Sequence, residues 1–217
     1  MRGNKAFTLA EVLITLVIIG VIGALTVPAL IQNTQKQEYV SALKKAYSTL
    51  SQASQQIIAE EGSPRCDEGG WACNYDSIHA AYKKHLNIAK ECKNNKECFA
   101  PKYTELSPGR TETYNGFSNG FVLTDGSSIT FGNITEDCTS GYWGNEPYCA
   151  RIFVDVNGHK APNKIGIDLF DFVIKESGLK PSGCDGPDYW CHSTWTNHGG
   201  VGFGCACKAL REGAMNY

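Results

Sequence analysis

Hydrophobic and polar residues divide this chain into an apolar start, an amphipathic continuation and a long mixed remainder. From Phe7 to Ile31, 25 consecutive residues include a single charged side chain, that of Glu11. A run of this length is enough for a helix to cross a bilayer, which takes about 20 residues. A carboxylate left unpaired in lipid is costly, so Glu11 is expected to have a functional partner.

The polar stretch from Gln32 to Glu61 continues the helical pattern. Its apolar residues recur at intervals of three or four and form one narrow stripe: Tyr39, Leu43, Ala46, Leu50, Ala53 and Ile57. Gly62-Ser63-Pro64 then ends the helix. The pattern predicts one long helix whose second half packs its stripe on a globular head. A two-chain coiled coil is the weaker alternative, because the stripe contains small alanines and covers few heptads.

The remaining residues, 62–217, are long enough for one domain. Asp76 or Ser77 is expected to begin a helix that extends to about Lys90. Four runs have the composition of strands, and the first two flank an Asp125-Gly126 turn: Phe121–Thr124, Ser127–Phe131, Arg151–Val156 and Ile167–Ile174. The sequence therefore predicts an α+β fold, with the long amino-terminal helix packed on an antiparallel sheet of about four strands.

The head is also expected to be rich in disulfides. It holds all ten cysteines of the chain: Cys66, Cys73, Cys92, Cys98, Cys138, Cys149, Cys184, Cys191, Cys205 and Cys207. An even number beyond an export segment indicates an oxidising compartment. The short-range pairs Cys66–Cys73, Cys92–Cys98 and Cys138–Cys149 are expected, and Cys205 and Cys207 should each reach Cys184 or Cys191. The alternative for the last group is zinc, with His192 and His198, but the spacings match no standard zinc pattern.

The amino-terminal segment carries a recognisable motif. A short basic leader, Met1–Ala6, precedes Phe7-Thr8-Leu9-Ala10-Glu11, and Pro28 lies inside the apolar run. On these residues the segment resembles the type IV prepilin signal shared by type IV pilins and type II secretion pseudopilins, although Ala6 stands where that family usually has Gly. A secretory signal peptide has a shorter apolar core, about 7–15 residues. A plain signal anchor would leave Glu11 unexplained.

The resemblance implies a processing and assembly route. A membrane-embedded prepilin peptidase would cut between Ala6 and Phe7, and the new amino terminus on Phe7 would be N-methylated. Glu11 would then pair with the Phe7 amine of a neighbouring subunit in a helical filament, which compensates two charges where the dielectric is low. The chain would comprise a leader (1–6), a transmembrane or filament-core helix (7–31), an amphipathic continuation (32–61) and an exoplasmic head (62–217). It would reside in the inner membrane, with a single pass, until it joins the filament.

Charge and motifs narrow the function further. The chain has 20 basic and 22 acidic side chains, a net charge of −2, which becomes −4 once Arg2 and Lys5 are removed. This balance gives no indication of nucleic-acid binding over a broad surface. The sequence contains no Gly-x-Ser-x-Gly, phosphate-binding loop or His-Glu-x-x-His motif, so catalysis is not expected.

One loop offers candidate metal ligands. Asp155, Asn157, Asn163 and Asp168 supply oxygen atoms of the kind that calcium prefers. The spacing is not that of an EF-hand, although some pseudopilin heads carry calcium in a loop between late strands. Asp and Asn also stabilise turns through bonds to their own backbone, and this interpretation is favoured. No cofactor is required, and calcium is an option.

The sequence thus predicts a structural subunit of a type IV pilus or a type II secretion pseudopilus. Its partners would be the membrane, prepilin peptidase, related pilin subunits and the pilus or secretion machinery. A minor pilin-like subunit that captures DNA, a glycan or a secreted substrate is one alternative. Four tryptophans in the Cys-rich loops bear on it, although they are expected to wedge against disulfides: Trp71, Trp143, Trp190 and Trp195. A membrane-anchored exoplasmic protein that never polymerises is the other.

Overall fold

The computed structural model describes residues 8–93, 95–107, 111–112, 120–135, 137–139, 141, 147–185, 191 and 201–217. The helices are α1 (Leu9–Glu61), η1 (Cys66–Glu68), α2 (Tyr75–Lys83), α3 (Asn95–Cys98) and α4 (Cys205–Glu212). The strands are β1 (Ile88–Cys92), β2 (Tyr103–Thr104), β3 (Thr111–Glu112), β4 (Gly120–Leu123), β5 (Ser128–Gly132), β6 (Ala150–Asp155), β7 (Leu169–Lys175) and β8 (Gly178–Pro181). The chain divides between Glu38 and Tyr39 into two compact units, which are described separately.

The first unit is helical from Leu9 onward, and α1 continues through Pro28. A proline has no N–H to donate, and in a soluble helix interior it costs about 3 kcal/mol. The apolar side chains here are exposed, with Leu9 at 78% and Leu25 at 73%. Within this unit they have no core to enter, so their burial must come from a membrane or from other molecules.

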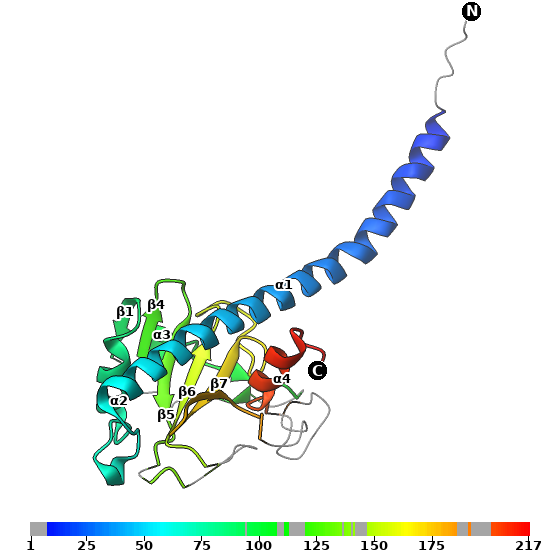
Figure 1. Ribbon diagram of the computed structural model, residues 1–217. Coiled ribbons are helices and arrows are strands. Elements are labelled where there is room, and N and C mark those ends of the chain that lie inside the picture. Colours follow the sequence, from blue (N-terminus) through cyan, green and yellow to red (C-terminus); the bar gives the residue numbers. More distant parts are fainter. Residues whose placement is uncertain are drawn as a thin grey trace, which may run out of the picture. The chain divides into compact units, whose positions relative to one another are not determined.

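In the second unit, the rest of α1 lies across an antiparallel sheet (Figure 1). Leu43, Leu50 and Ile57 of the predicted stripe are fully buried, Ala46 and Ala53 nearly so, and Tyr39 is partly buried. The α+β class and the packing of the long helix on a sheet are therefore confirmed. Gly62 ends the helix with φ +84°, and its N–H donates to the Ile58 carbonyl at 3.0 Å. This is the left-handed cap that glycine adopts without strain.

The predicted strand count was too low. The main sheet has six strands in the order β1-β4-β5-β6-β7-β8, and β2 pairs with β3 in a separate two-stranded sheet. The two strands missed in the main sheet are its edges, β1 and β8. The expected helix to Lys90 was also wrong at both ends: Asn74 caps α2, its side chain accepting from the Ser77 N–H at 2.9 Å, and α2 ends at Lys83. Ile88–Cys92 instead form the strand β1, which pairs with the neighbouring strand β4. This pairing between distant parts of the chain overrides the local helical pattern.

The sheet is covered on both faces. Side chains alternate along β6, so that Ile152 and Val154 face the core beneath α1 and α2, while Arg151, Phe153 and Asp155 point to the opposite face. That opposite face is closed by a second cluster around Phe99, Tyr103, Ile165, Val201 and Phe203. Two-sided cover explains why β5, β6 and β7 are buried along their whole length.

One buried ion pair lies on this second face. Arg151 Nε donates to Asp171 Oδ2 at 3.0 Å, Arg151 Nη2 contacts the same oxygen, and Ser182 Oγ donates to it at 2.5 Å. The guanidinium carbon lies 4.9 Å from the ring centroids of both Phe153 and Phe203. Burial raises the pKa of Asp171, and Arg151 opposes that shift. A buried charge of this kind is tolerated because it is paired and hydrogen-bonded.

Five disulfides brace the head: Cys66–Cys73, Cys92–Cys98, Cys138–Cys149, Cys184–Cys207 and Cys191–Cys205. The first three are the short-range pairs expected from the sequence, and the last two join Cys184 and Cys191 to the start of α4. Since no cysteine is free, no thiolate remains for zinc in this structure. His192 and His198 lie outside the described residues.

Candidate functional site

The apolar first part of α1 is the clearest candidate for a functional surface. Among the described residues, one helix is long and apolar enough to cross a membrane, and it is α1. Its large hydrophobic side chains remain exposed from Leu9 through Ile31. A continuous apolar surface of this size marks a site of contact with lipid or with other protein.

The lone carboxylate of this segment caps its own helix. Glu11 Oε2 accepts two hydrogen bonds from Thr8, from the backbone N–H and from Oγ1, each at 2.8 Å. In return the Glu11 N–H donates to Thr8 Oγ1 at 3.3 Å. These reciprocal bonds form a capping box, in which two backbone donors at the helix start are satisfied together.

The cap also fixes where the charge lies. A carboxylate near a helix amino terminus is favoured by the helix dipole, and here it is held by Thr8 within the first turn. Both of these bonds from Thr8 are to Oε2, and the carboxylate has a second oxygen, Oε1, that can accept a further hydrogen bond. Ala6 and Phe7, between which the sequence predicts cleavage, lie outside the described residues.

Thr8 is the functional residue that sequence reasoning missed. The signal was present as Thr-x-x-Glu immediately before an apolar run, which is the pattern of a capping box. From the sequence, Glu11 is expected to have a partner in a neighbouring chain, and that expectation stays a prediction. The structure shows a partner within the same chain, Thr8, on Glu11 Oε2.

The Asp-rich loop after β6 brings its four predicted residues into one region. Asp155 Oδ2 accepts from Tyr103 OH at 2.5 Å, and its Oδ1 accepts from the Asn157 N–H at 3.1 Å. Asp168 accepts from the Asn163 and Lys164 N–H groups at 2.7 and 2.6 Å. Burial raises the pKa of Asp155 to about 8 and that of Asp168 to about 6, and each of these hydrogen bonds works against the shift.

These contacts bear on the calcium hypothesis in two ways. Each oxygen of both carboxylates accepts a hydrogen bond from an N–H or O–H group. Asp residues stabilise turns through bonds of this kind to the backbone. The side-chain oxygens of Asn157 and Asn163 are buried and have no hydrogen-bond partner among the described residues. Two amide oxygens beside two carboxylates have the chemistry of a calcium site. The N–H and O–H groups that donate to these carboxylates favour the alternative, in which the residues only stabilise the turn. Calcium binding stays a prediction.

The loop also holds α1. Asn157 Nδ2 donates to Tyr39 OH at 3.4 Å and to the Ala161 carbonyl at 3.3 Å. Tyr39 OH lies 3.4 Å from that same carbonyl. The turn therefore contacts the first residue of the head unit, so its main structural effect is to fix the start of the buried half of α1.

Trp71 is the tryptophan whose surroundings the structure describes. It is 5% exposed, its Nε1 donates to the Gly62 carbonyl at 3.2 Å, and its ring meets Tyr82 edge-on with centroids 6.0 Å apart. It lies in the loop closed by Cys66–Cys73 and belongs to the main hydrophobic core, and the predicted packing of the indole against a disulfide stays a prediction. Trp143, Trp190 and Trp195 lie outside the described residues.

Comparison with known proteins bears on the amino-terminal segment. Residues 1–27 match the family model described as the prokaryotic N-terminal methylation motif, which is the signature of pilins and pseudopilins. No curated protein and no solved structure matches the chain. The motif supports a pilin-like precursor processed by prepilin peptidase, and together with the apolar helix it points to membrane anchoring.

Proposed function

We propose that this chain, whose first 27 residues carry the pilin-type methylation motif, is a structural subunit of a pilus or a secretion pseudopilus. Prepilin peptidase removes residues 1–6, Phe7 becomes the methylated amino terminus, and the first part of α1 holds the subunit in the inner membrane with its head outside. Assembly transfers that helix from lipid into the core of a helical filament. The role is structural and not enzymatic.

The observation that carries this proposal is the contrast in burial along α1. The apolar residues before Gln32 are exposed, whereas the stripe after Glu38 is buried in the head. Burying one large aliphatic side chain is worth about 1.5–3 kcal/mol, so the exposed set represents a large unsatisfied driving force in water. In the monomer, lipid surrounds these side chains and removes them from water. In a filament, the same side chains are buried by close packing against neighbouring helices.

Glu11 gives this assembly its register. An unpaired carboxylate resists entry into an apolar core, and a nearby ammonium offsets that cost only with good geometry and additional hydrogen bonds. Thr8 supplies the additional hydrogen bonds, which its N–H and Oγ1 donate to Glu11 Oε2. Oε1 then accepts from the charged amine on Phe7 of an adjacent copy. Helices that slide out of register would lose this pair.

The experiment is a comparison of Glu11→Ala with Glu38→Ala, a matched change at an exposed glutamate of the same helix. Glu11→Ala should leave the protein stable and membrane-bound but remove it from sheared filaments. Glu38→Ala should be incorporated as well as the wild type. Normal filament yield from Glu11→Ala would contradict the proposal, as would equal loss from both variants.

A further inference from the structure

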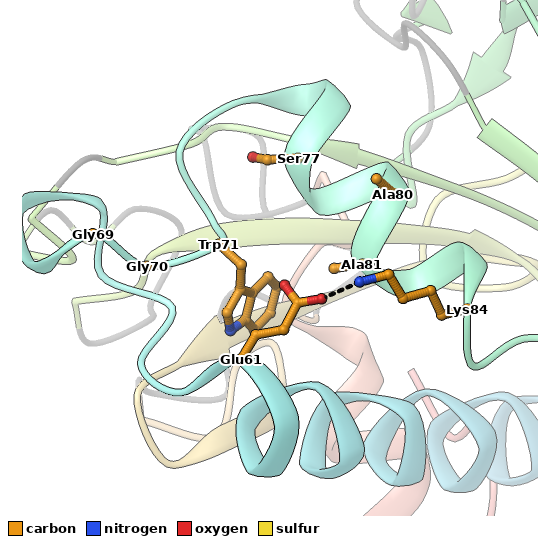
Figure 2. A pocket seen from close by; sticks show the side chains of 8 residues that line it. All are labelled: Glu61, Gly69, Gly70, Trp71, Ser77, Ala80, Ala81 and Lys84. Atoms are coloured by element: carbon orange, nitrogen blue, oxygen red, sulfur yellow. Dashed lines mark hydrogen bonds and ion pairs between the residues drawn. The ribbon is translucent and has the colours of Figure 1, made fainter.

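The head contains a hollow that the proposed assembly does not use. It lies beside the end of α1 and has a volume of about 360 Å³ (Figure 2). Glu61 forms one side, the loop segment Gly69–Trp71 a second, and the face of α2 that carries Ala80 and Ala81 a third. Its size falls at the lower end of the range of small-molecule sites, about 300–1,000 Å³.

The hollow is a consequence of small residues held in rigid walls. Gly69 and Gly70 face Ala80 and Ala81, so no bulky side chain fills the space between loop and helix. The Cys66–Cys73 disulfide closes the loop, and the Ala72 N–H donates to the Pro64 carbonyl at 3.1 Å. A Cβ on Gly70 would lie 2.2 Å from the Ser63 carbonyl oxygen, so the backbone path requires glycine. The cavity is therefore formed before any ligand arrives, which reduces the entropy cost of binding.

The two charged side chains that line the hollow, Glu61 and Lys84, form an ion pair. Lys84 Nζ lies 2.5 Å from Glu61 Oε1, and Figure 2 shows this pair next to the Trp71 indole. An ammonium has three N–H donors and a carboxylate has two oxygens, so the pair offers both donors and acceptors to a ligand. The hydrogen bond and charge of Glu61 raise the pKa of Lys84, which keeps it protonated.

These features select the chemical class of the ligand. A cation or an anion would have to compete with the opposite charge already in place, so the lining favours a neutral molecule. An apolar molecule would leave the charged pair without the hydrogen bonds that water gives it. A hydroxyl group both donates and accepts, and the C–H groups of a sugar ring fit against the alanine wall and the small part of the 5%-exposed Trp71 indole that lines the hollow.

We propose that this hollow binds a neutral saccharide, of about the size of a disaccharide. Lys84 and Glu61 hydrogen-bond its hydroxyl groups, and its rings lie against Ala80 and the part of Trp71 that lines the hollow. A subunit that is displayed in many copies on a filament would then present many such sites, which raises overall avidity even where one site is weak.

The test uses the full-length chain in a detergent that has no sugar headgroup. Saturation-transfer NMR would be recorded with maltose, lactose, cellobiose and N,N′-diacetylchitobiose. Ala80→Leu fills the hollow from an exposed helical position, where leucine is well tolerated. Ala89→Leu, at an exposed position on the edge strand β1, is the matched control. Near-UV circular dichroism would verify that both variants are folded.

Saturation transfer to at least one of the four sugars is expected for the wild type and for Ala89→Leu, with loss of the signal in Ala80→Leu. Lys84→Met should also lose it. Transfer to none of the sugars would overturn the proposal, and so would an unchanged signal in folded Ala80→Leu. Filament yield reports separately on assembly, and Ala80→Leu should leave it unchanged, so failure of this proposal is distinguishable from failure of the proposed function.

Discussion

The two parts of α1 share one secondary structure but differ in what buries them. In the part beyond Glu38, Leu43, Leu50 and Ile57 are fully buried against the sheet. In the part before Gln32, Leu16 and Leu25 are 61% and 73% exposed. The first set is buried within the head, whereas the second has no core to pack on among the described residues. One helix therefore contains both part of the core of the head and an apolar surface that is exposed for contact with lipid or other protein.

The head and the first part of α1 also differ in how their charged side chains are paired. In the head, Asp171 is buried and meets Arg151 of the same chain. In the apolar run of residues 7–31, the only charged side chain is that of Glu11, and it accepts its hydrogen bonds from Thr8, which carries no charge. The head supplies its own counter-charge. In the proposed filament, the counter-charge of Glu11 is the Phe7 amine of a neighbouring copy, which would link processing to assembly.

The largest expected effect separates the two parts by stability. Leu50→Ala should lower the free energy of unfolding of the head by about 2–5 kcal/mol, because it leaves a cavity in a closed core. Leu16→Ala should leave that free energy unchanged, because Leu16 is not in the core of the head. Denaturant titration of both variants in micelles, followed by near-UV circular dichroism, measures the contrast. Equal losses would break the comparison.

The next effect concerns the covalent bracing, which lies wholly in the head. Replacing Cys184 and Cys207 by Ala together removes a crosslink that spans 23 residues, and should lower the stability of the head by about 3 kcal/mol. The helicity of the first part of α1 should not change, since it contains no cysteine. Hydrogen exchange resolved along the chain would report both quantities. Faster exchange before Gln32 would show that the parts are coupled.

A third effect is the pH dependence of the head. The folded state holds a proton on Asp155 up to a pKa of about 8, whereas the unfolded chain loses it near its ordinary value of 3.8. Stability should therefore fall as pH rises between these values. The loss from pH 5 to pH 8 should be at least about 1.4 kcal/mol, the equivalent of one pKa unit. Asp155→Asn should flatten this slope, as measured by denaturant titration in a chelator.

The same titration decides between turn and calcium site. Calcium binds ionised carboxylates, so a calcium site at Asp155 and Asp168 requires added calcium to stabilise the head more at pH 8 than at pH 5. Equal midpoints with calcium and with chelator would assign the loop to turn formation alone. Neither result would change the conclusions about the exposed part of α1, which lies in the other unit.

The smallest effect concerns a surface contact between α1 and the β4–β5 turn. Lys45 Nζ lies 3.1 Å from Asp125 Oδ2, and the lysine is 63% exposed. Lys45→Ala should therefore lower the stability of the head by less than about 1 kcal/mol. Lys36→Ala, in the first unit, should have no effect on it. Unfolding midpoints of the two variants would be measured in low and in high salt. A loss of stability in Lys45→Ala well above about 1 kcal/mol would contradict this prediction and show that the turn holds the helix in place.

Periodicity alone predicted the features that depend on local pattern. The stripe from Leu43 to Ile57, the hairpin at Asp125-Gly126 and the central strands β6 and β7 all follow from residue spacing and turn chemistry. The edge strands could not be found in this way. Ile88–Cys92 continues a helical apolar spacing, and Gly178–Pro181 is short and contains both Gly and Pro. Each is a strand because a paired neighbour is present.

The candidate sites show the same limit. Glu11 stands out in the sequence because it is the only charge in an apolar run, and Thr8 was identifiable from the capping pattern. The hollow beside Trp71 has no sequence signal, because it depends on Glu61, Gly69 and Ala80 meeting from three separate segments. Likewise, the raised pKa of Asp155 follows from its burial under the second cluster, which outweighs the opposing hydrogen bond from Tyr103, and long-range packing of this kind is not visible in local spacing.

The most direct test of the central claim is the mass of the amino-terminal peptide from chains recovered in sheared filaments. The account predicts a peptide that begins at Phe7, carries one methyl group on its amine and lacks residues 1–6. Filament chains that still begin at Met1 would contradict it, because Glu11 would then have no new amino terminus to meet.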